Sequence, residues 1–194
     1  MKKIFTILFG TTILASSNVK AQAVEQGSKV IEAYVGLGGL EADYLYFRFN
    51  KIILGGRFEY MVSDKIGIGV DGHVQKISKY WNDNISDTIT GISNNYSYEL
   101  YRQIIRIMPR VNIHFEWSFS FDGYFGIAAG YRNETRRYTS TDPDYKDDEV
   151  ILPPFAMRIS VGGRYFFTDN IGLNMELGLG GGTVLNGGLI YKIN

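Results

Sequence analysis

Two stretches of the sequence, GGRFEYMVSDKIGI at residues 55–68 and GGRYFFTDNIGL at residues 162–173, share one pattern. Each has Gly-Gly-Arg and an aromatic residue, then a three-residue polar turn with Asp at its centre, then Ile-Gly and an aliphatic residue. Alternation of apolar and polar residues on both sides of a short polar segment predicts two strands joined by a tight hairpin. Counting back from the turns by twos places Arg57 and Arg164 on the face opposite the apolar residues. Each strand therefore has one apolar and one polar face.

The same alternation recurs along the chain and predicts eight strands, at about residues 29–38, 52–62, 66–75, 105–115, 121–130, 157–165, 172–179 and 185–193. Three connections are predicted to be tight turns of three residues, at 63–65, 116–118 and 168–170. Two polar segments, 78–97 and 132–149, are rich in loop-forming residues and are predicted to be long loops. In an antiparallel meander this order places the tight turns at one end and the long loops at the other.

One residue interrupts the fourth predicted strand. Pro109 lies on its apolar side and cannot donate a ladder hydrogen bond, which predicts a bulge or a weak pairing there.

The N-terminus has the pattern of a secretory signal peptide. Lys2 and Lys3 precede an apolar run at residues 4–14 that is too short to span a bilayer, which argues against an anchor helix. Cleavage is predicted after Ala21, with cleavage after Ala23 as the alternative, so residues 1–21 form the signal peptide and residues 22–194 one barrel domain. The mature chain retains 17 basic and 20 acidic residues and a charge of −3, which excludes a nucleic-acid footprint. The absence of cysteine excludes disulfides and thiol chemistry.

The strands allow two arrangements, a soluble lipocalin-like barrel with the apolar face inside or a membrane barrel with that face outside. Glycine and small residues dominate the polar face, as the narrow lumen of eight strands requires. The charged residues on that face are nearly balanced, and arginine, which suits confined ion pairs, outnumbers lysine. The predicted lumen charge network consists of Glu32, Arg57, Glu59, Asp71, Arg106, Arg110, Asp122, Arg158, Arg164, Glu176 and Lys192.

These observations favour an all-β fold, an eight-stranded antiparallel up-and-down transmembrane β-barrel with short periplasmic turns and longer extracellular loops. Aromatic residues near strand ends suit a girdle at the membrane interface: Tyr60, Trp117, Tyr165, Phe167 and Tyr191. The expected location is the bacterial outer membrane, with membrane lipid as partner and a monomeric barrel.

The chain resembles small outer-membrane β-barrel proteins of the OmpX/OmpA-transmembrane-domain type, in the porin family of outer-membrane β-barrel domains. The resemblance covers essentially the whole mature chain and depends on the Gly-Gly-Arg-aromatic strands, the Ser/Thr-Asp-x-Ile-Gly turns, the strand at 124–131 and the pattern of Leu185, Leu189, Tyr191 and Ile193. It implies that the C-terminal strand is recognised by the outer-membrane assembly machinery. Barrels of this type typically end on an aromatic residue, whereas this chain keeps the alternation with Tyr191 and ends at Asn194.

His73 and His114 both lie on the predicted lumen face, but their distances from the tight turns place them at heights that differ by roughly 15–20 Å. We therefore predict no shared metal site and no cofactor. Outer-membrane lipid A deacylases resemble this strand plan and carry a His-x-Ser pair. The chain has Val74-Gln75 after His73 and Phe115-Glu116 after His114, so that pair is absent and no catalytic residue is predicted.

The expected function is a structural or surface-interaction role, in which a closed, salt-bridged barrel presents the 78–97 and 132–149 segments to an extracellular ligand. The alternative is a porin-like narrow channel for small solutes. A lipid-modifying enzyme of the envelope is a third hypothesis, and the sequence carries no nucleophile arrangement that supports it.

Overall fold

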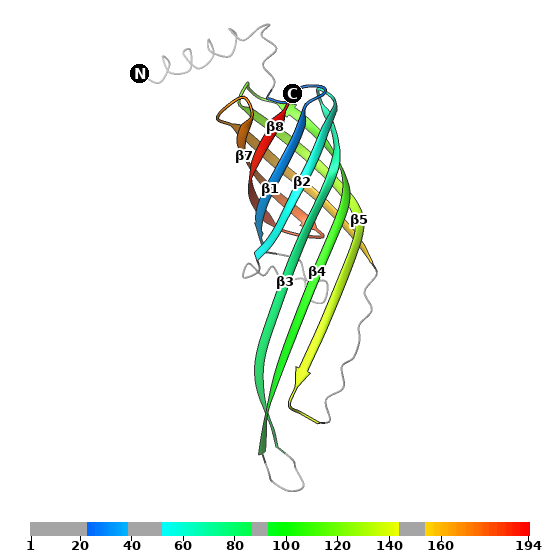
Figure 1. Cartoon of the computed structure of the whole chain (residues 1–194), viewed down its shortest axis with the longest axis vertical. Coiled ribbons are helices and arrows are strands. Elements are labelled where there is room, and N and C mark those ends of the chain that lie inside the picture. The colour runs from blue at the N-terminus through cyan, green and yellow to red at the C-terminus, as the bar shows by residue number, and fades with distance from the viewer. Residues whose placement is uncertain (1–22, 39–51, 87–92, 144–153) are drawn as a thin grey trace, which may run out of the picture.

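The computed structural model of the chain describes residues 23–38, 52–86, 93–143 and 154–194. These form one closed barrel in which each strand pairs antiparallel with the next and β8 pairs with β1 (Figure 1). The strands are β1 (Lys29–Leu37), β2 (Ile52–Ser63), β3 (Ile66–Ser86), β4 (Ser93–Glu116), β5 (Phe121–Ser140), β6 (Phe155–Phe166), β7 (Ile171–Gly180) and β8 (Leu185–Ile193). The predicted eight-stranded up-and-down barrel is confirmed. The part of the chain described contains no helix long and apolar enough to cross a membrane.

The barrel is apolar outside and polar inside. On β2, Leu54 and Phe58 are exposed, whereas Arg57 and Glu59 are buried, and the same alternation holds on the other strands. Most buried charged side chains of the described residues point into the lumen, which excludes the lipocalin-like arrangement. We call the exposed outer surface the apolar band.

The tight turns all lie at the end of the barrel where the chain terminates (Figure 1). Their predicted length of three residues is wrong in each case. The β2–β3 turn has two residues after a register irregularity between Met61 and Ser63, and the β4–β5 and β6–β7 turns have four residues each. Side-chain hydroxyls set these lengths, because Ser63 accepts a hydrogen bond from the backbone N–H of Ile66 at 3.1 Å and Thr168 one from Ile171 at 2.9 Å.

The largest correction concerns the two predicted loops. The 78–97 segment is mostly strand, because β3 continues to Ser86 and β4 begins at Ser93, and β5 continues through the 132–149 segment to Ser140. Residues 87–92 and 144–149 of these segments lie outside the described residues. The three strands project beyond the barrel as one sheet (Figure 1). We call this sheet the extension; it comprises residues 76–86, 93–103 and 133–140.

The prediction of loops at 78–97 and 132–149 was wrong because polar residues occupy the outer face of these strands. Outward residues of the extension include Lys76, Ser78, Glu99, Gln103, Asn133 and Thr135, with Tyr80 and Tyr101 among them. The aliphatic outer face therefore ends near Val74 and Ile105. A sheet that is wetted on its outer face does not need apolar residues there, and its sequence then loses the period that identifies a strand.

Pro109 weakens one ladder without a bulge. It pairs with Val70 on β3, but β4 and β5 have no paired residues between Ile107–Tyr131 and Arg110–Ala128. The register is the same on both sides of this gap. The predicted weak pairing is therefore confirmed and the alternative of a bulge is wrong.

The two Gly-Gly-Arg motifs have one geometry. Tyr34 lies opposite Gly55 and Tyr124 opposite Gly162, and a Cβ atom on either glycine would overlap the tyrosine ring. The rings cover bare backbone inside the lumen, as aromatic residues do beside strand glycines. The arginine two residues later stacks on the same ring, Arg57 at 4.4 Å from the Tyr34 centroid and Arg164 at 4.8 Å from that of Tyr124.

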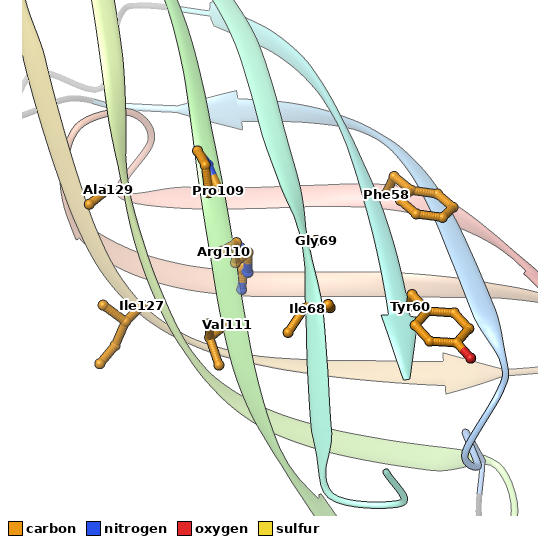
Figure 2. A pocket seen from close by; sticks show the side chains of 9 residues that line it. All are labelled: Phe58, Tyr60, Ile68, Gly69, Pro109, Arg110, Val111, Ile127 and Ala129. Carbon is orange, nitrogen blue, oxygen red and sulfur yellow. The ribbon is translucent and has the colours of Figure 1, made fainter. Parts of the chain in front are cut away.

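The outer wall has a shallow groove of about 800 Å³. Figure 2 shows Phe58 and Tyr60 on one side of it, Val111 and Ile127 on the other, and Gly69 between them. Gly69 tolerates no side chain because a Cβ atom would overlap the carbonyl oxygen of Phe58. The groove is therefore a consequence of close strand approach in an apolar surface.

Candidate functional site in the barrel lumen

The lumen holds the predicted charged residues. Ten of them are buried, and Lys192 is half-buried at the turn end: the ten are Glu32, Arg57, Glu59, Asp71, Arg106, Arg110, Asp122, Arg158, Arg164 and Glu176. Each lies on the inward face because successive residues of a strand point alternately inward and outward, and the charged residues occupy the inward positions. A charged group removed from water at this level must be paired and hydrogen-bonded.

Glu176 on β7 is the centre of the largest cluster. Its Oε1 accepts hydrogen bonds from Arg57 Nη2 at 2.8 Å and Arg158 Nη2 at 3.0 Å, and its Oε2 from Arg110 Nη2 at 2.5 Å. The Tyr124 hydroxyl donates to Oε2 at 3.0 Å. One carboxylate thus joins strands on opposite sides of the lumen.

Arg57 extends this cluster to the β1–β3 side. Its Nε donates to Asp71 at 2.5 Å and its Nη1 to Glu32 at 3.2 Å. Asp71 also accepts from the Tyr34 hydroxyl at 2.8 Å, and Glu32 from the Asn174 amide at 2.8 Å. Every polar arm of Arg57 therefore meets a carboxylate, as bidentate arginine recognition favours.

A second cluster lies toward the turns. Arg164 forms ion pairs with Glu59 and Asp122, and His114 lies between the same two carboxylates, at 3.1 Å and 2.8 Å. The Asn112 amide donates to Glu59 at 2.5 Å. Arg57 and Arg164 hold equivalent places in the two motifs, but only Arg57 reaches Glu176.

The two histidines are far apart along the lumen. His73 lies opposite Arg106 on β4, and His114 lies eight residues further along that strand. The spacing corresponds to about 26 Å at 3.3 Å per residue before strand tilt. Within the described residues, no group of three His, Asp, Glu or Cys side chains is arranged to hold a metal ion.

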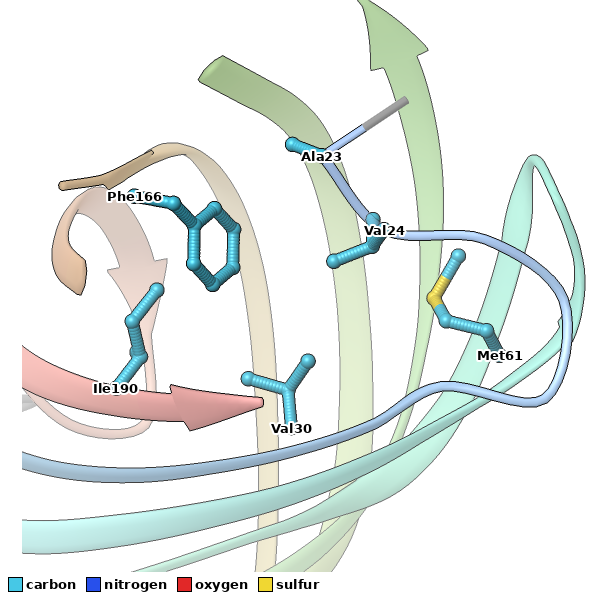
Figure 3. Close-up of a cluster of buried hydrophobic side chains, with 6 residues drawn as sticks. All are labelled: Ala23, Val24, Val30, Met61, Phe166 and Ile190. Carbon is cyan, nitrogen blue, oxygen red and sulfur yellow. The ribbon is translucent and has the colours of Figure 1, made fainter. Parts of the chain in front are cut away.

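Apolar side chains close the turn end of the lumen. Ala23 and Val24 fold over it and pack against Val30, Met61, Phe166 and Ile190 (Figure 3). Lys192 Nζ donates to the Ala23 carbonyl oxygen at 2.9 Å, and the Gly27 N–H to that of Met61 at 2.9 Å. We call this N-terminal segment, residues 23–28, the stopper.

The loop end of the lumen is rich in arginine. Glu134 on β5 is contacted by Arg132 and Arg102, and Arg136 Nε donates to it at 2.6 Å. Burial opposes ionisation of this carboxyl group, but hydrogen bonds from Arg102 and Arg136 and the charges of Arg102 and Arg132 hold the pKa of Glu134 below its ordinary value. The three guanidinium groups are only partly exposed.

The predicted girdle residues all lie exposed near the turn end. Tyr60, Tyr165 and Tyr191 stand at the ends of β2, β6 and β8, Phe167 lies in the β6–β7 turn, and Trp117 in the β4–β5 turn is 77% exposed. Trp117 stacks on Phe121 at 5.4 Å.

The sequence analysis missed several members of the lumen network. Tyr34, Tyr124, Asn112 and Asn174 are buried and bind its carboxylates, and their strand phase could have identified them. The contacts of the stopper could not be predicted in this way, because Ala23 and Val24 precede the first strand and show no alternation of apolar and polar residues.

The fold and the lumen define an inside-out barrel, which is the arrangement of transmembrane β-barrels. No protein-family model matches the chain, and no curated relative matches it. Among solved structures, it is similar to the N-terminal β-barrel domain of OprF from Pseudomonas aeruginosa, with 13% identity, a TM-score of 0.48, and coverage of 88% of this chain and 100% of that one.

Two further matches have similar extents. The outer membrane protein OprG from P. aeruginosa has 11% identity and a TM-score of 0.47 over 91% of this chain and 100% of that one. Ail, the attachment invasion locus protein of Yersinia pestis, has 9% identity and a TM-score of 0.45 over 88% of this chain and 100% of that one. At these identities the likeness concerns the backbone and says nothing of activity.

Proposed function

We propose that the chain is an integral β-barrel of a bacterial outer membrane with a structural and surface-contact role, and that its lumen is closed to solutes. The apolar band carries the membrane assignment, because a continuous apolar exterior around a charged interior is stable only when lipid surrounds the barrel. The signal peptide predicted at residues 1–21 is consistent with this location.

The packing of the lumen supports closure. Eight strands leave an interior just wide enough for side chains, and here Arg57, Arg110, Tyr124 and Glu176 are hydrogen-bonded across it. The stopper covers the turn end. A conducting path would require these buried ion pairs to separate.

The extension supports the surface-contact role. It is polar on its outer face, and its inner face carries Tyr98, which is stacked on Trp81 at 5.5 Å and donates to Asp142 at 3.0 Å. A structured sheet presents its side chains in fixed positions and loses less entropy on binding than a flexible loop would.

The histidines of the lumen give no support to a catalytic role. Within the described structure, His73 contacts Asp71, Tyr34 and Arg106, and His114 contacts Glu59, Asp122 and Tyr124. Neither forms a hydrogen bond with a serine or threonine hydroxyl there. A nucleophile activated by a histidine needs such a contact.

The two tryptophans of the chain allow a direct test of membrane placement, because Trp117 lies at the turn end and Trp81 in the extension. In phospholipid vesicles, Trp81→Phe leaves Trp117 as the reporter, and Trp117→Phe leaves Trp81. We expect brominated acyl chains to quench Trp117 and aqueous iodide to quench Trp81. Equal iodide quenching of both, or a mature protein that stays soluble without detergent, would refute the membrane assignment.

Closure is tested by single-channel recording on the refolded protein in planar bilayers. We expect no steady conductance. A steady conductance that changes with Arg106→Ala, and not with Arg137→Ala on the outer face of the extension, would establish the narrow channel instead. Cleavage of the extension by trypsin on intact cells, with the barrel protected, is the expected sign of surface presentation.

A further inference from the structure

Arg106 differs from the other arginines that line the lumen. Arg57, Arg110, Arg158 and Arg164 each contact at least one carboxylate within 4 Å. Arg106 is 8% exposed, and no carboxylate of the described residues lies within ion-pair distance of it. A buried cation without an anion is costly, so its retention requires an explanation.

The partners of Arg106 are neutral. Its Nη1 donates to Gln75 Oε1 at 3.3 Å and faces His73 Nε2 at 3.3 Å, and its Nε is buried with no hydrogen-bond partner among the described residues. His73 Nδ1 lies 3.1 Å from Asp71, so an imidazole that donates there presents a lone pair to Arg106. The guanidinium is thus oriented by its neighbours, while no carboxylate of the described residues pairs with its charge.

The surroundings of Arg106 are cationic. Arg132 is its register partner on β5, and Arg102 and Arg136 are register partners four residues further toward the extension. Among these five side chains on the inward face, Glu134 is the one carboxylate, and it is shared by Arg102, Arg132 and Arg136. Arginines on adjacent strands, with planar forks, are the arrangement that binds phosphate groups.

We propose that the loop end of the lumen is a phosphate-binding site in which Arg106 supplies the buried charge and Arg102, Arg132 and Arg136 the outer donors. This goes beyond the proposed function but depends on it in one respect, because the loop end must face the cell exterior for the site to meet a phosphorylated lipid headgroup or a free phosphate compound. The shared chemistry of these ligands is a phosphate group.

The test uses the folded full-length mature protein in an uncharged detergent, with inorganic phosphate as the probe and chloride at matched ionic strength as the reference. The unfolding midpoint, followed by gel mobility after heating, is expected to rise with phosphate and to saturate, because a ligand of the folded state stabilises it. Arg106→Gln is expected to weaken phosphate binding by about tenfold to a hundredfold, since a charged hydrogen bond is lost.

Arg137→Gln is the matched control, since it removes one positive charge from the outer face of the same region and is expected to retain the phosphate effect. If the wild-type protein shows no saturable response, or if Arg106→Gln responds as the wild type does, the site is refuted. If phosphate binds only after Asp147, Asp148 and Glu149 are changed to amides, the occupant is the chain's own acidic segment and the proposal is also refuted.

A bilayer arm separates the two sources of phosphate. In phosphatidylcholine vesicles, an Arg106-dependent stabilisation by added phosphatidic acid that free phosphate displaces assigns the site to a headgroup. Stabilisation by free phosphate alone assigns it to a soluble compound. Either result supports the site. A barrel that inserts and stays silent in bilayers but ignores phosphate refutes this inference and leaves the proposed function intact.

Discussion

Glu176 and Glu134 are each contacted by three arginine side chains, yet the two clusters differ in their surroundings. Glu176 lies inside the apolar band with no side-chain exposure, and Arg57 and Arg110 of its cluster also contact Asp71. Glu134 lies where the extension begins and is 12% exposed. Three arginines around one carboxylate therefore fill the lumen at Glu176, away from water, whereas at Glu134 the same arrangement lies partly exposed at the loop end.

The comparison indicates that access to water, more than residue type, determines how much an ion pair contributes to stability. Without water, loss of one partner leaves uncompensated charges, whereas near water the solvent replaces the partner at little cost. β4 and β5 pass through both regions, so a substitution on either strand within the barrel can be compared with one on the same strand in the extension.

The largest effect is expected for Glu176→Gln. It leaves three buried guanidinium groups without their common anion and should lower the free energy of unfolding by about 3–5 kcal/mol or prevent folding. Urea unfolding in vesicles, followed by gel mobility, measures this. Glu99→Gln on the outer face of the extension is the control and should change stability by less than about 0.5 kcal/mol. A near-neutral Glu176→Gln would mean that water already fills the lumen.

The second effect concerns the outer faces of one strand. Ile127→Arg places a charge in the apolar band and should cost about 2–4 kcal/mol, while Thr135→Arg on the extension should cost about 0.5 kcal/mol or less. The same unfolding measurement in vesicles compares them. Equal costs at the two positions would place the membrane boundary elsewhere than at Tyr131.

A smaller effect is expected at the stopper. Lys192→Gln loses the hydrogen bond to the Ala23 carbonyl oxygen and should cost about 1 kcal/mol. The same contact favours processing after Ala21, because cleavage after Ala23 would remove that carbonyl and place the charged amino group of Val24 in the apolar cluster. The intact mass of the mature protein should therefore correspond to an N-terminal Gln22. A chain that begins at Val24 would contradict this prediction.

The smallest effect is expected at Glu134. Glu134→Gln should cost about 1 kcal/mol or less at neutral pH. Because the pKa of Glu134 is lowered in the folded state, its contribution is present above the unfolded pKa and is lost as pH falls through the lower folded pKa. A nitroxide at Thr135→Cys, the only thiol in the chain, should become more mobile on acidification in the wild-type background. An identical response in Glu134→Gln would assign the transition to another carboxylate.

The strands of the band could be predicted because they obey one rule along their length. Lipid outside and a narrow lumen inside demand opposite residue types on successive positions, so Ile105, Arg106 and Ile107 already show which side faces which solvent. The extension could not be predicted in this way. Its outward residues, such as Gln103 and Thr135, are polar, and nothing in their spacing separates a wetted strand from a loop.

The sequence by itself determined the eight-stranded barrel, the inward phase of its charges and the end at which the tight turns lie, because these follow from a local period of two. Only the tertiary structure decided which charges meet. Arg57 and Glu176 are 119 positions apart, and their 2.8 Å contact depends on the closure of β8 on β1. Among the described residues, the same closure leaves Arg106 beside His73, Gln75 and Arg132. Ion pairing across a lumen depends on the height and angle of each side chain, which no local pattern encodes.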